Sequence, residues 1–307
     1  MNSLRNERGQ TLVISVLFLV VLCGMAAAVL DVGSWFRAQR ATQAAADAAA
    51  LAGAQVLPYD PGNASFLAGN YAAKNDGGLD GVTFSGKLVA NDTINVQFHR
   101  PAPGFFAKVF GMGSVTVGAK ASAHAANLSS ARWVAPIVVN EKHPMLTCKP
   151  KPCFGAGTEL DYYHLKTSGA QNDGAGSFGF INLDPSISNP GSSTMEEWIR
   201  KGFSGYMPLG DYDARTGNPF SSSAIGDSLA DRIGSEILFP VYRKLTGTGS
   251  NAQYEIIGWV GFYLTGFKLT GNDEKLYGHF TQVIWEGIQS ETNSQPDFGA
   301  RAIALVD

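Results

Sequence analysis

A long apolar run near the N-terminus constrains this chain more than any other feature. From Leu12 to Leu30 the run is broken only by Ser15 and Gly24. A helix needs about 20 apolar residues to cross a bilayer core of roughly 30 Å. The segment from Thr11 to Leu30 supplies that length, and it therefore predicts a transmembrane helix.

The helix is expected to continue beyond the apolar run as a stalk. Alanine, the strongest helix former, dominates residues 43–54, and no proline occurs before Pro58. Asp31 directly follows the apolar run, and we expect it at the outer edge of the membrane. Trp35 and Phe36 would be aromatic residues of the lipid–water interface there.

A cleaved signal peptide is the alternative to a permanent anchor, because Ala26–Ala28 resembles a small-residue cleavage site. The apolar run is too long for that reading, and the helical pattern continues after it. Arginines 5 and 8 precede the run and arginines 37 and 40 follow it, so charge alone orients the chain weakly. The long polar remainder, all of it C-terminal, favours a single pass with the N-terminus inside and the bulk of the chain outside.

Three motifs in this region carry a family resemblance: Arg8-Gly9-Gln10, Leu30-Asp31-Val32-Gly33 and the alanine-rich stretch Gln43–Ala54. Together they resemble the N-terminal segment of TadE/TadG-like proteins of the Flp (tight adherence) pilus-assembly system. A looser resemblance to the exoplasmic part of TadG-like proteins lies in Gly179–Leu183, Trp198–Gly202, Leu238–Tyr242 and Ile257–Phe262.

The resemblance has one departure. Pilins and their processed relatives are cut after a glycine and have a glutamate at the fifth mature position, where this chain has Ile14 if counted from Gln10. The departure favours the uncleaved, TadG-like branch. The resemblance implies a non-enzymatic component of a pilus assembly or secretion machine, either monomeric or homo-oligomeric. It would be anchored in the bacterial cytoplasmic (inner) membrane, with the bulk of the chain periplasmic or extracytoplasmic. Its partners would be other pilus-assembly or pilin-like membrane proteins, bound through the N-terminal helix.

Small residues recur at four-residue steps along the predicted helix, which lets a second backbone approach closely. The set comprises Gly24, Ala28, Ala41, Ala45, Ala49 and Gly53. Two interpretations stay open for this helix-packing face. It packs either against a partner helix in an assembly or against the protein's own globular part.

The remaining chain predicts an α+β protein. Glycine is abundant (36 residues) and charged residues are few (16%), which suits β-rich domains with many turns. We expect a small pseudopilin-like α+β region and then a β-rich exoplasmic domain with two short helices. The expected divisions are 1–10 (cytoplasmic N-terminus), 11–30 (transmembrane helix), 31–57 (stalk), 58–130 (small α+β region) and 131–307 (β-rich domain).

Local patterns give the elements of these regions. A strand over Thr93–Phe98 is expected to be broken by the stretch from Pro101 to Gly104. Ser193 and Glu196 form a capping box at the start of one short helix, and Gly202 stands at its end. Glycines 258, 261 and 266 interrupt the longest predicted strand (254–269) and predict bulges or tight bends, as in a closing barrel or a strongly curled sheet. A strand is also expected over residues 159–166, and another over 276–288.

Cys148 and Cys153 are the only cysteine pair with local spacing, and they predict a structural disulfide. With His143 and His164 they form an alternative metal-site hypothesis, although the spacing fits no standard zinc motif. The third cysteine, Cys23, lies in the apolar run.

No catalytic or cofactor motif stands out. Asp211 and Asp213 near Asn218 are compatible with calcium, but the loop pattern of a calcium site is missing. The serines Ser221–Ser223 are not part of a Gly-x-Ser-x-Gly nucleophile elbow, and the sequence contains no phosphate-binding loop. With a net charge of −3 and no basic block, nucleic acid is not an expected partner.

The alternatives to a pilus-assembly component are a membrane-tethered extracytoplasmic binding or sensory domain and, third, a periplasmic enzyme.

Overall fold

The computed structural model describes residues 8–75, 78–149, 151–162, 177–215, 223–270 and 273–306. Its contacts divide the chain into two units. Unit 1 comprises residues 1–124 and 304–307, and unit 2 comprises residues 125–303. The division falls within one strand, β3 (Ser114–Ala131), a few residues before the boundary expected at residue 130.

Unit 1 is organised around α1 (Arg8–Ala54), a single helix of 47 residues. At 1.5 Å per residue it is about 70 Å long. The prediction that the helix continues past the apolar run is confirmed. Alanine-rich sequence without proline keeps the backbone helical up to Ala54, shortly before Pro58.

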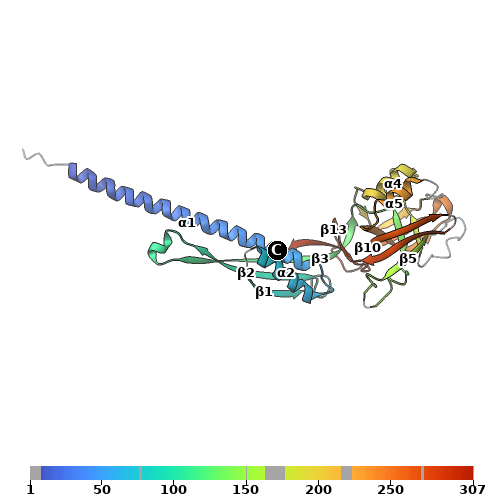
Figure 1. Cartoon of the computed structure of the whole chain (residues 1–307), viewed down its shortest axis with the longest axis horizontal. Coiled ribbons are helices and arrows are strands. Elements are labelled where there is room, and N and C mark those ends of the chain that lie inside the picture. Colours follow the sequence, from blue (N-terminus) through green and yellow to red (C-terminus); the bar gives the residue numbers. More distant parts are fainter. Residues whose placement is uncertain are drawn as a thin grey trace, which may run out of the picture. The chain divides into compact units, whose positions relative to one another are not determined.

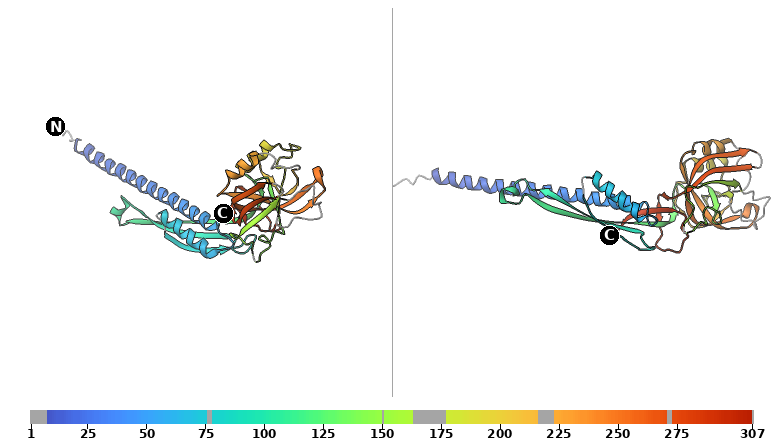
Figure 2. Two further views of the ribbon diagram at one scale, coloured as in Figure 1. Left: turned by 45° about the vertical axis from the view of Figure 1, so that its right-hand side comes forward. Right: turned by 60° about the horizontal axis from the view of Figure 1, so that its bottom comes forward.

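A second helix and a β-meander complete unit 1. The helix α2 (Pro61–Lys74) is capped at its N-terminus by Asp60, whose carboxylate accepts a hydrogen bond from the Asn63 amide at 2.9 Å. The strands β1 (Gly78–Ser85), β2 (Thr93–Pro103) and the first part of β3 follow, with the 3-10 turn η1 (Ala107–Phe110) between β2 and β3. Figures 1 and 2 show the β2–β3 hairpin lying alongside α1, with η1 at the end that points toward the helix N-terminus.

The strand ends at Pro103, within the break expected over residues 101–104, but Pro101 itself still belongs to it. β2 continues to Pro103 and pairs with β3 in an uninterrupted antiparallel register, in which Pro101 lies opposite Thr116. Because β1 pairs with β2 only up to His99, the last residues of β2 have a partner strand on one side in the described part of the chain. A missing amide proton is tolerated at such an edge.

The core of unit 1 consists mostly of small side chains. Alanines of α1 and α2 are buried against the sheet, where Ile94, Val96 and Phe98 of β2 meet them. The buried alanines are Ala45, Ala46, Ala49, Ala50, Ala52, Ala54, Ala64, Ala68 and Ala72. Side chains this small let the two helices and the strand approach closely.

Unit 2 contains a closed β-barrel. Its pairing order is β11–β5–β6–β4–β9–β10, and β10 pairs with β11 to close the ring, while β8 adds to β10. These elements are β4 (Ile137–Asn140), β5 (Gly157–Tyr162), β6 (Ser177–Phe180), β8 (Gly210–Asp213), β9 (Glu236–Thr246), β10 (Gln253–Thr270) and β11 (Asp273–Thr281). The helices α4 (Ser192–Lys201) and α5 (Ser223–Ala230) lie next to each other beside the barrel (Figure 1).

Glycines let the longest strand curl. The register of β10 shifts at Gly258 against β9 and at Gly266 against β11, so the bulges predicted from these residues are confirmed. A Cβ at Gly261 would lie 2.9 Å from the Thr281 carbonyl oxygen across the β10–β11 pairing. Only glycine fits where the barrel closes this tightly.

The core of unit 2 is rich in aromatic rings. Phe262 stacks on Phe239 at 5.1 Å between ring centroids and meets Phe280 edge-on at 5.4 Å. Tyr242 and Tyr254 form a second edge-on pair at 4.7 Å. All five are buried and join aliphatic side chains from the strands and both helices.

Smaller elements of unit 2 lie outside the barrel. β7 (Met207–Pro208) and β13 (Gly287–Gln289) pair with the second part of β3, and β12 (Val283–Ile284) runs parallel to β14 (Ala300–Val306). A short 3-10 turn, η3 (Gly249–Asn251), precedes β10. The single strand expected over residues 276–288 is instead divided among β11, β12 and β13. The strand expected over 159–166 ends at Tyr162, and its last residues lie outside the described ranges.

The predicted capping box of α4 is wrong. The helix begins at Ser192, its N-cap is Gly191, and no side chain caps it. Glu196 instead pairs with Arg200 one turn later, at 2.9 Å between Oε1 and the guanidinium nitrogen. The predicted end is confirmed, because Gly202 terminates α4 with a φ of +83°.

Candidate functional site

The N-terminal half of α1 presents its large apolar side chains outward. Every residue from Thr11 to Ala26 is exposed, including Leu17, Phe18 and Leu19. The helix is long and apolar enough to cross a membrane, and none of its most apolar 18-residue stretch is buried. A soluble protein rarely exposes so continuous an apolar surface.

Asp31 connects this exposed half of α1 to the β2–β3 hairpin. Its carboxylate is almost fully buried and accepts backbone hydrogen bonds from Phe105 at 2.8 Å, Phe106 at 3.0 Å and Ala107. The acidic side chain expected at the end of the apolar run therefore holds the start of η1. Hydrogen bonds from amides to a carboxylate are stronger than neutral ones.

Polar side chains further along α1 continue this attachment. The Ser34 hydroxyl donates to the Pro103 carbonyl at 3.4 Å, and the Gln39 amide donates to the Gly118 carbonyl at 2.6 Å. The Gln43 amide donates both to the Lys120 carbonyl, at 3.0 Å, and to the Asp47 carboxylate, at 2.8 Å. The hairpin is thus fastened to one stripe of α1 over three helical turns.

The hairpin ends in an apolar loop, which we call the tip and define as residues 104–113. The Gly104 amide donates to the Gly113 carbonyl at 3.1 Å and closes it. Its large side chains are all exposed, most of all Phe110 at 83% and Val109 at 82%. A pair of phenylalanines between glycines, Gly104-Phe105-Phe106 to Gly111, is the signal in the sequence that could have indicated an exposed apolar loop.

The predicted helix-packing face divides into two parts. Ala45, Ala49 and Gly53 are buried inside unit 1, and a Cβ on Gly53 would lie 2.9 Å from the Ala64 carbonyl oxygen and overlap Ile94. For these residues the packing partner in the structure is the protein's own globular part. Gly24, Ala28 and Ala41 are exposed.

Cys148 and Cys153 form a disulfide with their Cα atoms 5.6 Å apart. His143, proposed as a metal ligand with them, is buried instead. Its Nδ1 accepts the Met145 amide at 3.1 Å, and its ring meets Phe280 edge-on. Burial lowers the pKa of His143. His164 lies outside the described residues, and within the described ranges no group of three His, Cys, Asp or Glu side chains is placed to bind a metal ion.

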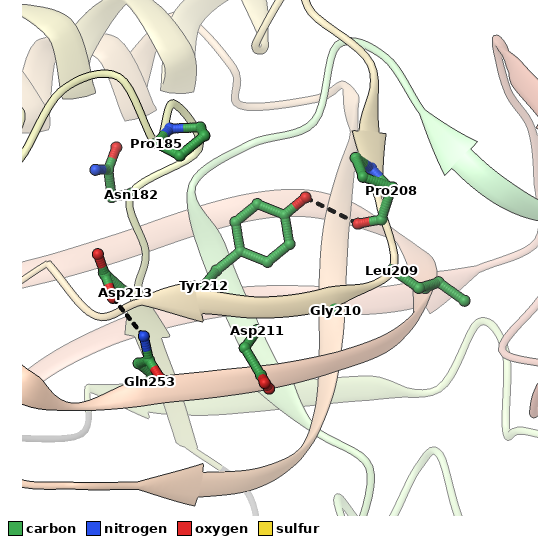
Figure 3. Close-up of a pocket in the computed structure, with 9 residues that line it drawn as sticks. All are labelled: Asn182, Pro185, Pro208, Leu209, Gly210, Asp211, Tyr212, Asp213 and Gln253. Atoms are coloured by element: carbon green, nitrogen blue, oxygen red, sulfur yellow. Dashed lines mark hydrogen bonds between the residues drawn. The ribbon is translucent and has the colours of Figure 1, made fainter.

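A cleft of about 460 Å³ lies in unit 2 beside β8 (Figure 3). Asp211, Tyr212 and Asp213 line it, and Asp213 accepts a hydrogen bond from Gln253 at 2.9 Å. The Tyr212 hydroxyl donates to the Pro208 carbonyl at 2.9 Å, and burial raises the pKa of Tyr212 to about 12. Asn218, expected near the two aspartates, lies outside the described residues, as do Ser221 and Ser222. The described lining contains no paired nucleophile and base.

Comparison with known proteins places one part of the chain. Residues 9–56 match the Flp pilus-assembly TadE/G-like family model. The N-terminal segment is TadE/G-like. The match covers α1 almost from end to end, including the exposed apolar half, Asp31 and the buried alanines of the stalk. No match was found among curated proteins or among solved structures.

Proposed function

We propose that the chain is a non-enzymatic component of a Flp/Tad pilus assembly or secretion machine that acts through protein contacts. The observation that carries this proposal is a coincidence of two features in one segment. The TadE/G-like match covers the same helix whose exposed apolar half has the length of a single-pass membrane anchor. In this proposal the N-terminus is cytoplasmic, residues 11–30 cross the bacterial inner membrane, and the rest of unit 1 and all of unit 2 lie outside it, as in the TadG-like branch.

Contact with other assembly proteins would be made within the membrane. Gly24 and Ala28 are exposed and lie one helical turn apart. A side chain at Gly24 would meet no atom of the described chain within 4 Å. Small residues at this spacing let two membrane helices pack closely. Because Ala45, Ala49 and Gly53 are already covered by unit 1, the membrane half of the stripe is the part available to a partner.

Complementation tests this function. In a bacterium whose own copy of the gene is deleted, the full chain should restore pili, whereas Gly24→Leu/Ala28→Leu should insert normally and fail to restore them. Cys23→Leu/Ala26→Leu places the same bulk on another side of the same helix and should restore pili. Normal pili after complete deletion of the gene would refute the assembly role. If both variants restored pili equally well, the assembly role would not depend on helix packing at Gly24 and Ala28.

The second candidate is a membrane-tethered binding domain, and the cleft beside β8 is the observation that favours it. Its volume falls within the range of small-molecule sites, and Asp211 and Asp213 give it acidic groups. Asp211→Asn/Asp213→Asn in the complementation experiment separates the two functions. Restored pili would leave the cleft without a part in assembly.

A further inference from the structure

We propose that the hairpin tip, residues 104–113, inserts into the outer leaflet of the membrane that α1 crosses. The inference rests on the anchor part of the proposed function and adds a second membrane contact to it. The tip would therefore be covered by lipid, and neither water nor another protein would cover it.

The composition of the tip is the first argument. Five large apolar side chains are exposed in this one loop: Phe105, Phe106, Val109, Phe110 and Met112. The loop contains no acidic residue, and its single charged residue is Lys108. An exposed cluster of aromatic and aliphatic side chains marks an interaction surface. A lone lysine suits the phosphate groups that border the lipid tails.

The position of the tip is the second argument. Asp31 follows the apolar run directly, and its carboxylate binds the amides of residues 105–107. The tip is thereby fixed at the level where the run ends, beside the exposed side chains of Val29 and Leu30. Any lipid surface that covers these two residues lies next to the tip as well. Figure 1 shows the hairpin directed along α1 toward the end that enters the membrane.

The surroundings of the tip fit a lipid–water boundary. A Cβ at Gly104 would lie 3.7 Å from Trp35 Cζ2, so the indole ring is beside the base of the tip. Phe36 is exposed next to it, and Arg37 and Arg40 follow on exposed positions of α1. Aromatic residues and then basic residues occur in this order at membrane interfaces. The one carboxylate at this level, Asp31, has its hydrogen-bonding capacity filled by amides.

A second attachment has a mechanical consequence. A single helix tilts readily in a bilayer, since little besides its neighbours and interfacial anchors fixes its angle. The tip is held on one side of α1 by Asp31, Ser34 and Gln39. Insertion of the tip would therefore set both the tilt and the rotation of the stalk relative to the membrane plane.

Fluorescence quenching in proteoliposomes of phosphatidylethanolamine and phosphatidylglycerol tests this proposal on the full chain. The probe is an environment-sensitive nitrobenzoxadiazole attached to one cysteine under non-reducing conditions, which keep Cys148 and Cys153 joined. Cys23, the free cysteine in the apolar run, reports on the anchor. Cys23→Ala/Phe110→Cys reports on the tip. Cys23→Ala/Phe66→Cys is the matched control, because Phe66 is also exposed in unit 1, at 65%, but lies on α2.

We expect nitroxide-labelled lipids to quench the probe at position 110 several-fold more than at position 66, and aqueous iodide to show the reverse order. Iodide quenching at position 110 equal to that at position 66 would overturn the proposal. So would protection from both quenchers, because the tip would then be covered by protein. Quenching at Cys23 decides the anchor separately. Lipid contact there without lipid contact at position 110 leaves the proposed function intact and refutes only the inserted tip.

Discussion

The two units place their large apolar side chains in opposite ways. In unit 2 the aromatic rings are inside, where Phe239, Phe262 and Phe280 contact one another. In unit 1 the interior is filled with alanine, while the leucines, valines and phenylalanines of α1 and the tip face outward. An aqueous environment therefore suits unit 2, because its large apolar side chains are buried. In unit 1 the exposed side chains of the first half of α1 suit an apolar solvent. From Asp31 onward, polar contacts hold the β2–β3 hairpin to α1.

The largest expected effect tests the interior of unit 2. Phe262→Ala removes a fully buried ring that packs between two others, and it should lower the free energy of unfolding by about 3–5 kcal/mol. Phe66→Ala removes an exposed ring from unit 1 and should change the free energy by less than about 0.5 kcal/mol. Urea denaturation of the full chain in detergent measures both. Similar losses would contradict the contrast between the units.

The next effect tests the alanine interior of unit 1. Ala49→Leu inserts three carbon atoms where α1 meets α2 and β2, and overpacking should cost about 1–3 kcal/mol. Ala41→Leu, on the exposed part of the same stripe, keeps the same helix propensity and should be nearly neutral. Thermal melting of the two variants gives the comparison. If Ala49→Leu melted like the unsubstituted chain, the alanines would not be a packed interior.

Removal of the disulfide should cost about 2 kcal/mol, because the bond closes a loop of only six residues. The comparison is between Cys148→Ser/Cys153→Ser and the unsubstituted chain in the same urea experiment. Alkylation before reduction should label Cys23 alone in the unsubstituted chain. Labelling of either Cys148 or Cys153 at that stage, or stoichiometric zinc in the purified protein, would contradict a structural disulfide.

Acid should weaken a polar contact of unit 1. Burial tends to raise the pKa of Asp92, but hydrogen bonds from the amides of Val89, Lys87 and Leu88 outweigh it and hold this pKa below its ordinary value of 3.8. Because the folded-state pKa is the lower one, the stabilisation is present above about pH 4 and is lost as the pH falls through the folded-state pKa. Asp92→Asn should cost about 2 kcal/mol at neutral pH and flatten this acid limb.

A pH titration of stability for the two forms checks the Asp92 prediction. If the free energy of unfolding fell equally steeply below pH 4 in Asp92→Asn and in the unsubstituted chain, groups other than Asp92 would cause the acid sensitivity. Glu197 is a matched control, since it is an exposed acid that pairs with Lys201 across one turn of α4. Glu197→Gln should leave the acid limb unchanged.

The smallest effect is local and concerns Asp31. Asp31→Ala removes the acceptor for three amides at the base of the tip and should raise hydrogen exchange over residues 104–113. Ser34 and Gln39 remain bound to the hairpin, so exchange further along β2 and β3 should change little. Unchanged exchange in the tip would mean that its position does not depend on Asp31.

The sequence predicted the features that depend on local patterns. The unbroken helix follows from alanine content and from the absence of proline before Pro58, and the bulges of β10 follow from Gly258 and Gly266. Features that depend on distant partners were missed. Asp31 was placed at the end of the apolar run, but nothing in its neighbourhood identifies the amides of residues 105–107 as its partners.

The capping box of α4 failed for a local reason. Ser193 and Glu196 have the right spacing, but Glu196 pairs with Arg200 one helical turn later, a partner that the capping motif does not consider. Pro101 lies inside β2, shortly before the strand ends at Pro103, because proline is tolerated at an edge, and the sequence does not say which strands are at an edge. Pairing of β14 with β12 joins residues that no short pattern relates.

Membrane orientation of the full chain tests the central claim most directly, namely that unit 1 is anchored by α1 with everything beyond it outside the inner membrane. Protease added to intact spheroplasts should digest unit 2 and the part of unit 1 beyond the anchor, and leave a membrane-bound fragment that keeps an N-terminal tag. Permeabilised spheroplasts should lose the tag as well. Protection of both units in intact spheroplasts, or recovery of the folded chain in the soluble fraction, would contradict the anchor and its orientation.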